Sequence, residues 1–223
     1  MDNKEIFANY ELYSNVFSYP NLMLKEQINK VQKLVYNNYN SASNIFDKFV
    51  DFVGDAEVNL WEEIYTRSFD VQALTTLDLG YVLFGDDYKR GELLVNLSNE
   101  HKKVNNNCGY ELADHLPNVL RLLNKVEDNN LRADIISYLI YPAIKKIESE
   151  FDLKHIEKKS KIYRKLHRTI LEQNKTYGLI YIYTIQTLLI MLSDDFPELT
   201  SDKLNENNFT DQISQELSIE KLG

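Results

Sequence analysis

Asp114 and His115 are the neighbouring side chains best suited to chemistry, because they stand together where a helix is predicted to begin. Asp114 can cap that helix, and Pro117 then falls in its first turn, where proline is tolerated. A carboxylate and an imidazole at a positive helix end could bind the backbone or a cationic side chain of a peptide. The competing interpretation is that Asp114 is a helix cap and nothing more.

Three aromatic residues on one predicted helix face form the second candidate feature. Phe69 follows Tyr65 by four positions, and Trp61 lies one turn earlier, so the three rings share a face. Core packing explains such a stripe, and so does the apolar wall of a groove that binds a peptide helix. The sequence leaves both interpretations open.

A dense turn separates the two features and fixes the path of the chain between them. Gly85, Asp86 and Asp87 stop one segment, and either aspartate can cap the helix that follows. Arg90 and Gly91 come immediately afterwards. If the chain holds a functional site, we expect it where this turn meets the loop that contains Asp114.

Patterns typical of enzymes and metal sites are missing from the sequence. It contains no glycine-rich phosphate-binding motif and no HExxH zinc motif. The four histidines are scattered, with no pair separated by three or four positions, and no oxyanion motif surrounds the single Cys108. We therefore expect a protein that is not an enzyme and has no metal site.

The composition indicates a mostly helical protein that avoids nucleic acid. The net charge of −9 over 223 residues repels nucleic acid and anionic lipid. Seven Gly and four Pro are too few for a turn-rich β-sandwich or barrel. One cysteine fits a reducing compartment, the acidic N-terminus is unlike a secretory signal, and the apolar run 177–192 is short for a membrane span. These features predict a soluble, cytoplasmic protein without a membrane span.

Helical periodicity runs through most of the chain and predicts an all-α fold. We expect a single-domain bundle of roughly eight to ten helices over residues 1–197 and a polar tail, 198–223, that is frayed or disordered. The segment 79–84 could be a strand or a helix, and we favour helix because no second strand is available to pair with it. Pro142 should kink a long helix over 131–151. Other helices are expected at about 4–17, 22–36, 44–52, 56–68, 87–103, 114–126, 154–172 and 177–193.

Three segments in order resemble a known family. They read EEIYTRSFD, then TTLDLGYVLFGDDYKRG, then ELADHLP. This series is similar to that of the NarJ-type (delta-subunit) nitrate reductase assembly chaperones, which belong with the TorD- and DmsD-type redox enzyme maturation proteins. The likeness is good over residues 56–123 and weaker on either side. One departure is Ala113, where the family loop usually has proline, so the loop is expected to be less rigid.

The resemblance implies an all-helical, cofactor-free, TorD-like chaperone that holds the N-terminal peptide of a molybdoenzyme catalytic subunit. Such proteins keep the apoenzyme competent until molybdenum cofactor and iron–sulfur clusters are inserted, and nitrate reductase is the nearest client. By matching motif, the resemblance places peptide contacts as follows: groove-lining rings at Tyr65 and Phe69, with Trp61 beside them; a peptide-binding loop of Asp114, His115 and Pro117; and a supporting turn with Asp86 and Arg90.

Two further hypotheses compete with the chaperone. A hydrolase or nucleotide-binding enzyme would use Asp114, His115 and Asp86. An accessory subunit of a redox complex would dock through 154–168, which carries seven basic residues and is otherwise a solvated helix face. The oligomeric state is open between a monomer and a domain-swapped dimer.

Overall fold

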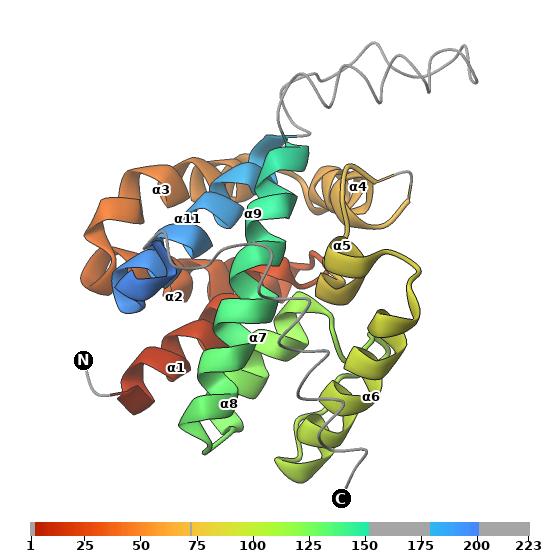
Figure 1. Ribbon diagram of the computed structural model, residues 1–223. Helices are drawn as coiled ribbons and strands as arrows, with labels where there is room; N and C mark the ends of the chain where they lie inside the picture. Colours follow the sequence, from red (N-terminus) through yellow and green to blue (C-terminus); the bar gives the residue numbers. More distant parts are fainter. Residues whose placement is uncertain (1–2, 72, 152–178, 201–223) are drawn as a thin grey trace, which may run out of the picture.

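The computed structural model describes residues 3–71, 73–151 and 179–200, and these residues form helices joined by short loops (Figure 1). The prediction of an all-α bundle is confirmed over this part of the chain. The short segment 79–84 is a helix, as expected. The helices are α1 (Asn3–Tyr13), α2 (Leu22–Asn38), α3 (Asn40–Asp55), α4 (Val58–Phe69), α5 (Leu79–Phe84), α6 (Tyr88–Lys103), α7 (Leu116–Lys125), α8 (Asn129–Asp134), α9 (Tyr141–Glu150) and α11 (Ile180–Asp195).

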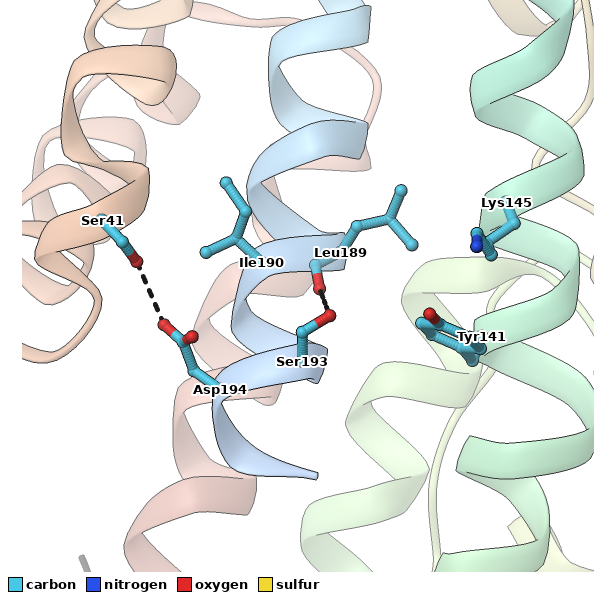
Figure 2. Close-up of a pocket in the computed structure, with 7 residues that line it drawn as sticks. All are labelled: Ser41, Tyr141, Lys145, Leu189, Ile190, Ser193 and Asp194. Carbon is cyan, nitrogen blue, oxygen red and sulfur yellow. Dashed lines mark hydrogen bonds between the residues drawn. The ribbon is translucent and has the colours of Figure 1, made fainter. Parts of the chain in front are cut away.

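Helix α11 lies between α3 and α9 (Figure 1). It packs against α3 on one side and α9 on the other, while α2 lies antiparallel beside α3 and α1 packs on α7 (Figures 1 and 2). Its inner face is apolar, with Ile185, Leu188 and Met191 fully buried. Helix α6 stands at the edge of the molecule and makes its main contacts with α5 (Figure 1).

The ends of the described chain are joined through Asp195, at the end of α11. Its Oδ2 atom accepts hydrogen bonds from the hydroxyl of Tyr10 at 2.8 Å and from that of Tyr39 at 2.7 Å. Tyr39 in turn accepts a hydrogen bond from the amide of Asn9. One carboxylate therefore connects α1, the α2–α3 junction and α11.

The helix predicted for 131–151 departs from a simple kinked rod. Residues Ile135–Ile140 form a π-helical turn between α8 and α9, and Pro142 lies in the first turn of α9. Proline has no N–H to donate to the carbonyl four residues earlier and clashes with that carbonyl in a regular α-helix. A wider π turn just before it accommodates both effects.

The predicted start of the C-terminal tail changes, and the predicted helix at 154–172 cannot be checked. Pro197–Thr200 form a 3₁₀ helix with Leu199 buried, so Glu198–Thr200 are ordered rather than the start of a frayed tail. Residues 201–223, and the helix predicted at 154–172 with its basic segment 154–168, lie outside the described residues. Within the described residues, no helix is both long enough and apolar enough to cross a membrane.

Candidate functional site

The loop before α5 and the loop before α7 lie against each other and bring the candidate residues together. Their backbones pair at an isolated antiparallel bridge between Asp78 and His115. The N–H of Leu79 donates to the carbonyl of Asp114 at 3.0 Å, and the N–H of Leu116 donates to that of Leu77 at 2.9 Å. This pairing sets side chains from two distant segments next to each other.

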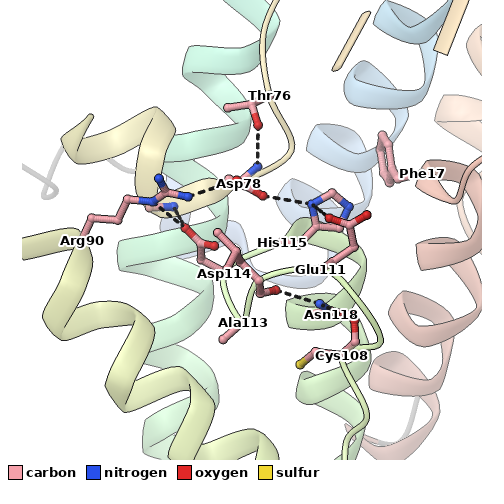
Figure 3. A network of polar contacts seen from close by, with 12 residues as sticks. Phe17, Thr76, Asp78, Arg90, Cys108, Glu111, Ala113, Asp114, His115 and Asn118 are labelled. Carbon is pink, nitrogen blue, oxygen red and sulfur yellow. Dashed lines mark hydrogen bonds and ion pairs between the residues drawn. The ribbon is translucent and has the colours of Figure 1, made fainter. Parts of the chain in front are cut away.

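Four side chains from these loops and from α6 form one polar network (Figure 3). Asp78 is central, because its Oδ1 lies 3.1 Å from Nδ1 of His115 and its Oδ2 accepts from the guanidinium of Arg90 at 3.0 Å. Nε of Arg90 also donates to Oδ2 of Asp114 at 3.3 Å. We call Asp78, Arg90, Asp114 and His115 the carboxylate network. It brings together three of the predicted site residues and adds Asp78.

Asp114 is not the helix cap that the sequence suggested. His115 occupies the N-cap position of α7, and no side chain caps that end. The carboxylate of Asp114 points instead toward the start of α5, where Oδ2 accepts from the N–H of Gly80 at 3.1 Å. The pairing of the two loops turns this side chain away from its own helix, which a cap prediction from local sequence cannot foresee.

Asp114 and Asp78 have opposite electrostatic settings. Asp114 is fully buried, and its Oδ1 has no hydrogen-bond partner among the described residues. Burial and the neighbouring charge of Asp78 raise the pKa of Asp114 despite the attraction of Arg90. Burial also acts to raise the pKa of Asp78, but His115 and Arg90 outweigh it and hold that pKa below its usual range. Asp78 is therefore the fixed negative charge of the network.

Gly80 makes the close approach of Asp114 possible. A Cβ atom built on this residue would lie 2.7 Å from Oδ2 of Asp114 and 2.9 Å from Cδ2 of Leu93. Both contacts are shorter than real Cβ atoms show, so a side chain here would displace the carboxylate. Neither Gly80 nor Asp78 was identified from the sequence as a site residue, although both lie in the second segment of the family resemblance.

The aromatic stripe is part of the core, and its assignment as a groove wall is wrong for this structure. The exposed fraction is 0 % for Trp61 and 8 % for both Tyr65 and Phe69. The ring of Tyr181 from α11 fills the space they would have lined, at centroid distances of 4.9 Å from Phe69 and 5.8 Å from Tyr65. Trp61 donates its indole N–H to the hydroxyl of Tyr181 at 2.9 Å.

Two exposed side chains lie near these features, Glu111 beside His115 and Tyr19 beside Tyr65. The hydroxyl of Tyr65 donates to the carbonyl of Phe17 at 3.0 Å. The Tyr19 ring packs edge-on against Tyr65 at 5.4 Å and is 52 % exposed. The side chain of Glu111 is 62 % exposed and lies 4.0 Å from His115. Burial, followed by the charges of Glu111, Asp70 and Asp78, raises the pKa of Tyr65. We call Tyr19, Asp70, Glu111 and His115 the acidic rim.

The other residues predicted for the site, Asp86 and Pro117, lie outside the carboxylate network and the acidic rim. Asp86 is exposed in the turn after α5, and the neighbouring Asp87 caps α6 by accepting from the N–H of Lys89 at 2.9 Å. Pro117 is buried in the first turn of α7, as expected, and touches the core rather than a free surface. Arg90 also lies 5.1 Å from the ring centre of Tyr81, which adds a cation–π contact.

Buried polar side chains hold the inner side of the loop that carries Glu111 and Asp114. Nε2 of His101 lies 2.9 Å from the carbonyl of Ala113, and the amide of Asn106 lies 2.8 Å from the other ring nitrogen. Burial lowers the pKa of His101, so the neutral ring donates from Nε2 and accepts at Nδ1. These bonds fix the loop at Ala113, where a less rigid loop was expected.

No group of three His, Cys, Asp or Glu side chains that could hold a metal ion occurs in the described part of the chain. Burial raises the pKa of the Cys108 thiol, so it is protonated at neutral pH. What the site offers is a fixed acidic surface with aromatic edges, suited to holding a cationic or amphipathic segment. No family model and no curated protein matches the chain.

Proposed function

We propose that this protein is a maturation chaperone that binds the N-terminal peptide of a molybdoenzyme catalytic subunit, as the NarJ-type proteins that it resembles do. The observation that carries the proposal is the convergence of separate motif residues. Asp78, Arg90 and the pair Asp114–His115 come from the second and third segments of the resemblance, yet they meet in the carboxylate network. Local helix formation does not require such a meeting.

The peptide would bind on the acidic rim rather than in a groove between aromatic rings. The rim combines the exposed ring of Tyr19 with the carboxylates of Glu111 and Asp70, and the carboxylate network holds His115 beside them. A basic amphipathic segment matches this surface, because its apolar side chains can cover the ring and its cations can pair with the acids. The net charge of −9 would speed the encounter.

Asp78 and Arg90 hold the proposed binding loop in place, and this role would account for charged side chains in a partly buried position. The two side chains hold the loop before α7 against α5 and α6. A binding loop that is already in place loses less conformational entropy when a ligand binds. The client enzyme would then be held without any covalent change, until molybdenum cofactor and iron–sulfur clusters are inserted.

Calorimetric titration with a synthetic peptide that copies the N-terminus of a nitrate reductase-type catalytic subunit tests the proposal. We expect saturable binding that Tyr19→Ala and Glu111→Gln each weaken by about tenfold, or roughly 1.4 kcal/mol. Tyr36→Ala on α2 and Glu92→Gln on α6 are matched controls, because both residues are exposed and neither belongs to the acidic rim.

Absence of binding by such peptides, in a protein with an intact circular dichroism spectrum, would refute the chaperone assignment. Equal losses in the rim and control variants would refute the location while leaving the function standing.

A further inference from the structure

The outer face of α11 is more apolar than that of most surface helices, although Gln186 interrupts it and donates to Glu148 of α9. Four apolar side chains on its outer side are only half-buried, although they recur at helical spacing: Ile182, Tyr183, Leu189 and Ile190. An apolar stripe on a helix usually packs against another part of the protein. We call these four residues the outer stripe of α11.

A groove runs beside this stripe, between α3 and α9 (Figure 2). Its volume is about 350 Å³. Leu189 and Ile190 form its apolar floor, Ser41 stands on the α3 side, and Tyr141 with Lys145 stands on the α9 side. At its lower end Ser41 donates a hydrogen bond to Asp194 at 3.1 Å.

The end of the described chain lies next to this groove. Asp194 lines it, and Thr200 follows only six positions later, as the last residue of the 3₁₀ helix Pro197–Thr200. The chain continues for residues 201–223. Nine residues lead from Thr200 to Phe209, and that length can span up to about 30 Å when extended. The outer stripe, from Ile182 to Ile190, is about 12 Å long on a helix, so the tether is long enough to reach it.

The composition of the C-terminal segment complements the groove. Phe209, Ile213 and Leu217 recur at intervals of four, so on a helix they would form one apolar stripe across two turns. Two acids lie in the same stretch, at positions 211 and 216, and a third follows at position 220. One basic side chain lines the groove, together with Asp194, and a second lies beside the outer stripe. Lys145 is on α9, and Lys48 on α3 lies 4.9 Å from the ring centre of Tyr183.

We propose that residues 209–217 of this chain dock as a helix on the outer stripe of α11, between α3 and α9. The docked segment buries Leu189 and Ile190 under its own apolar stripe and places its acids near Lys48 and Lys145. A short tether gives the segment a millimolar effective concentration at the groove, so even a weak contact is populated. The docking is independent of the peptide surface on the acidic rim.

Paramagnetic relaxation measured in the full-length chain tests this docking. A nitroxide is attached at Ser214→Cys in a Cys108→Ser background, and the methyl signals of isotope-labelled Ile and Leu are recorded. We expect the signals of Leu189 and Ile190 to lose intensity relative to the diamagnetic label. Leu97 on α6, at the far edge of the molecule, should keep its intensity (Figure 1).

Paired substitutions in the segment supply the specificity control. Ile213→Asp with Leu217→Asp places charge on the apolar stripe and should restore the signals of the groove. Gln215→Asp with Ser218→Asp adds the same charge on the opposite side and should not. All four positions lie beyond Thr200, outside the helical core described here.

Three results would overturn the docking. They are full intensity at Leu189 and Ile190, equal loss at Leu97, and persistence of the effect in Ile213→Asp with Leu217→Asp. A further test mixes spin-labelled chains without isotopes and isotope-labelled chains without a spin label. Loss of the Leu189 and Ile190 signals in this mixture would show that the tail of a second copy occupies the groove, and would also refute docking within one chain.

Discussion

Replacing Arg90 by methionine removes the only cation that contacts the buried carboxylate of Asp114 among the described residues. Removing one partner of a buried ion pair typically costs about 3–5 kcal/mol, because a charge stays buried without compensation. The Arg90 side chain is 18 % exposed, so water reaches this pair and the lower end of that range applies. We therefore expect Arg90→Met to lower the free energy of unfolding by about 3 kcal/mol at neutral pH.

The pH dependence identifies the buried carboxylate as the cause. The pKa of Asp114 is raised in the folded protein, so its contribution to stability is present at low pH and is lost as the pH rises through that value. Without Arg90 the pKa rises further, and the loss at neutral pH grows. The difference in the free energy of unfolding between wild type and Arg90→Met should thus be smaller at about pH 5 than at about pH 7.

Urea unfolding followed by circular dichroism measures these differences. Adding Asp114→Asn to Arg90→Met removes the uncompensated charge and should recover about 1–2 kcal/mol at neutral pH. Arg67→Met is the matched control, because Arg67 pairs with Glu63 on the surface of α4 at 50 % exposure. Its loss should stay below about 0.5 kcal/mol. The reasoning is refuted if Arg90→Met costs no more than Arg67→Met, or if the second substitution recovers nothing.

Two other perturbations have definite expected outcomes. Gly80→Ala should destabilise the fold by about 1–3 kcal/mol, because its Cβ would overlap Asp114, whereas Gly91→Ala should be neutral or stabilising by up to about 1 kcal/mol; thermal melts that rank them the other way would contradict the close packing. Burial raises the pKa of Asp195, so the wild type loses stability as pH rises through that value, and Asp195→Asn should flatten this slope; parallel urea-stability profiles from about pH 4 to pH 7 would show that Asp195 does not titrate differently on folding.

Local patterns were sufficient to predict most of the helices. The spacing of apolar residues marks helix faces, the capping aspartate at Asp87 marks the start of α6, and the absence of a partner strand favours helix for 79–84. Each of these depends on residues a few positions apart. The π turn before Pro142 is more than a proline rule can specify, because the rule says only that a regular helix cannot continue unchanged.

The candidate site was predictable only in part, because long-range pairing decides it. The expectation that the turn at Arg90 meets the loop of Asp114 agrees with the contact between these two side chains. Asp78 was missed because its partner His115 lies 37 positions away in the sequence. The stripe at Tyr65 is equally compatible with a groove and a core until the position of Tyr181 is known.

The contacts that α11 makes with earlier helices have a consequence for synthesis on the ribosome. Tyr181 completes the cluster of rings, and Asp195 joins α11 to Tyr10 and Tyr39. A nascent chain that has reached only α9 lacks both, so its aromatic residues stay open to solvent until the last described helix emerges. Folding of the bundle is therefore a late event in translation, and the nascent chain is open to aggregation and to other chaperones until then.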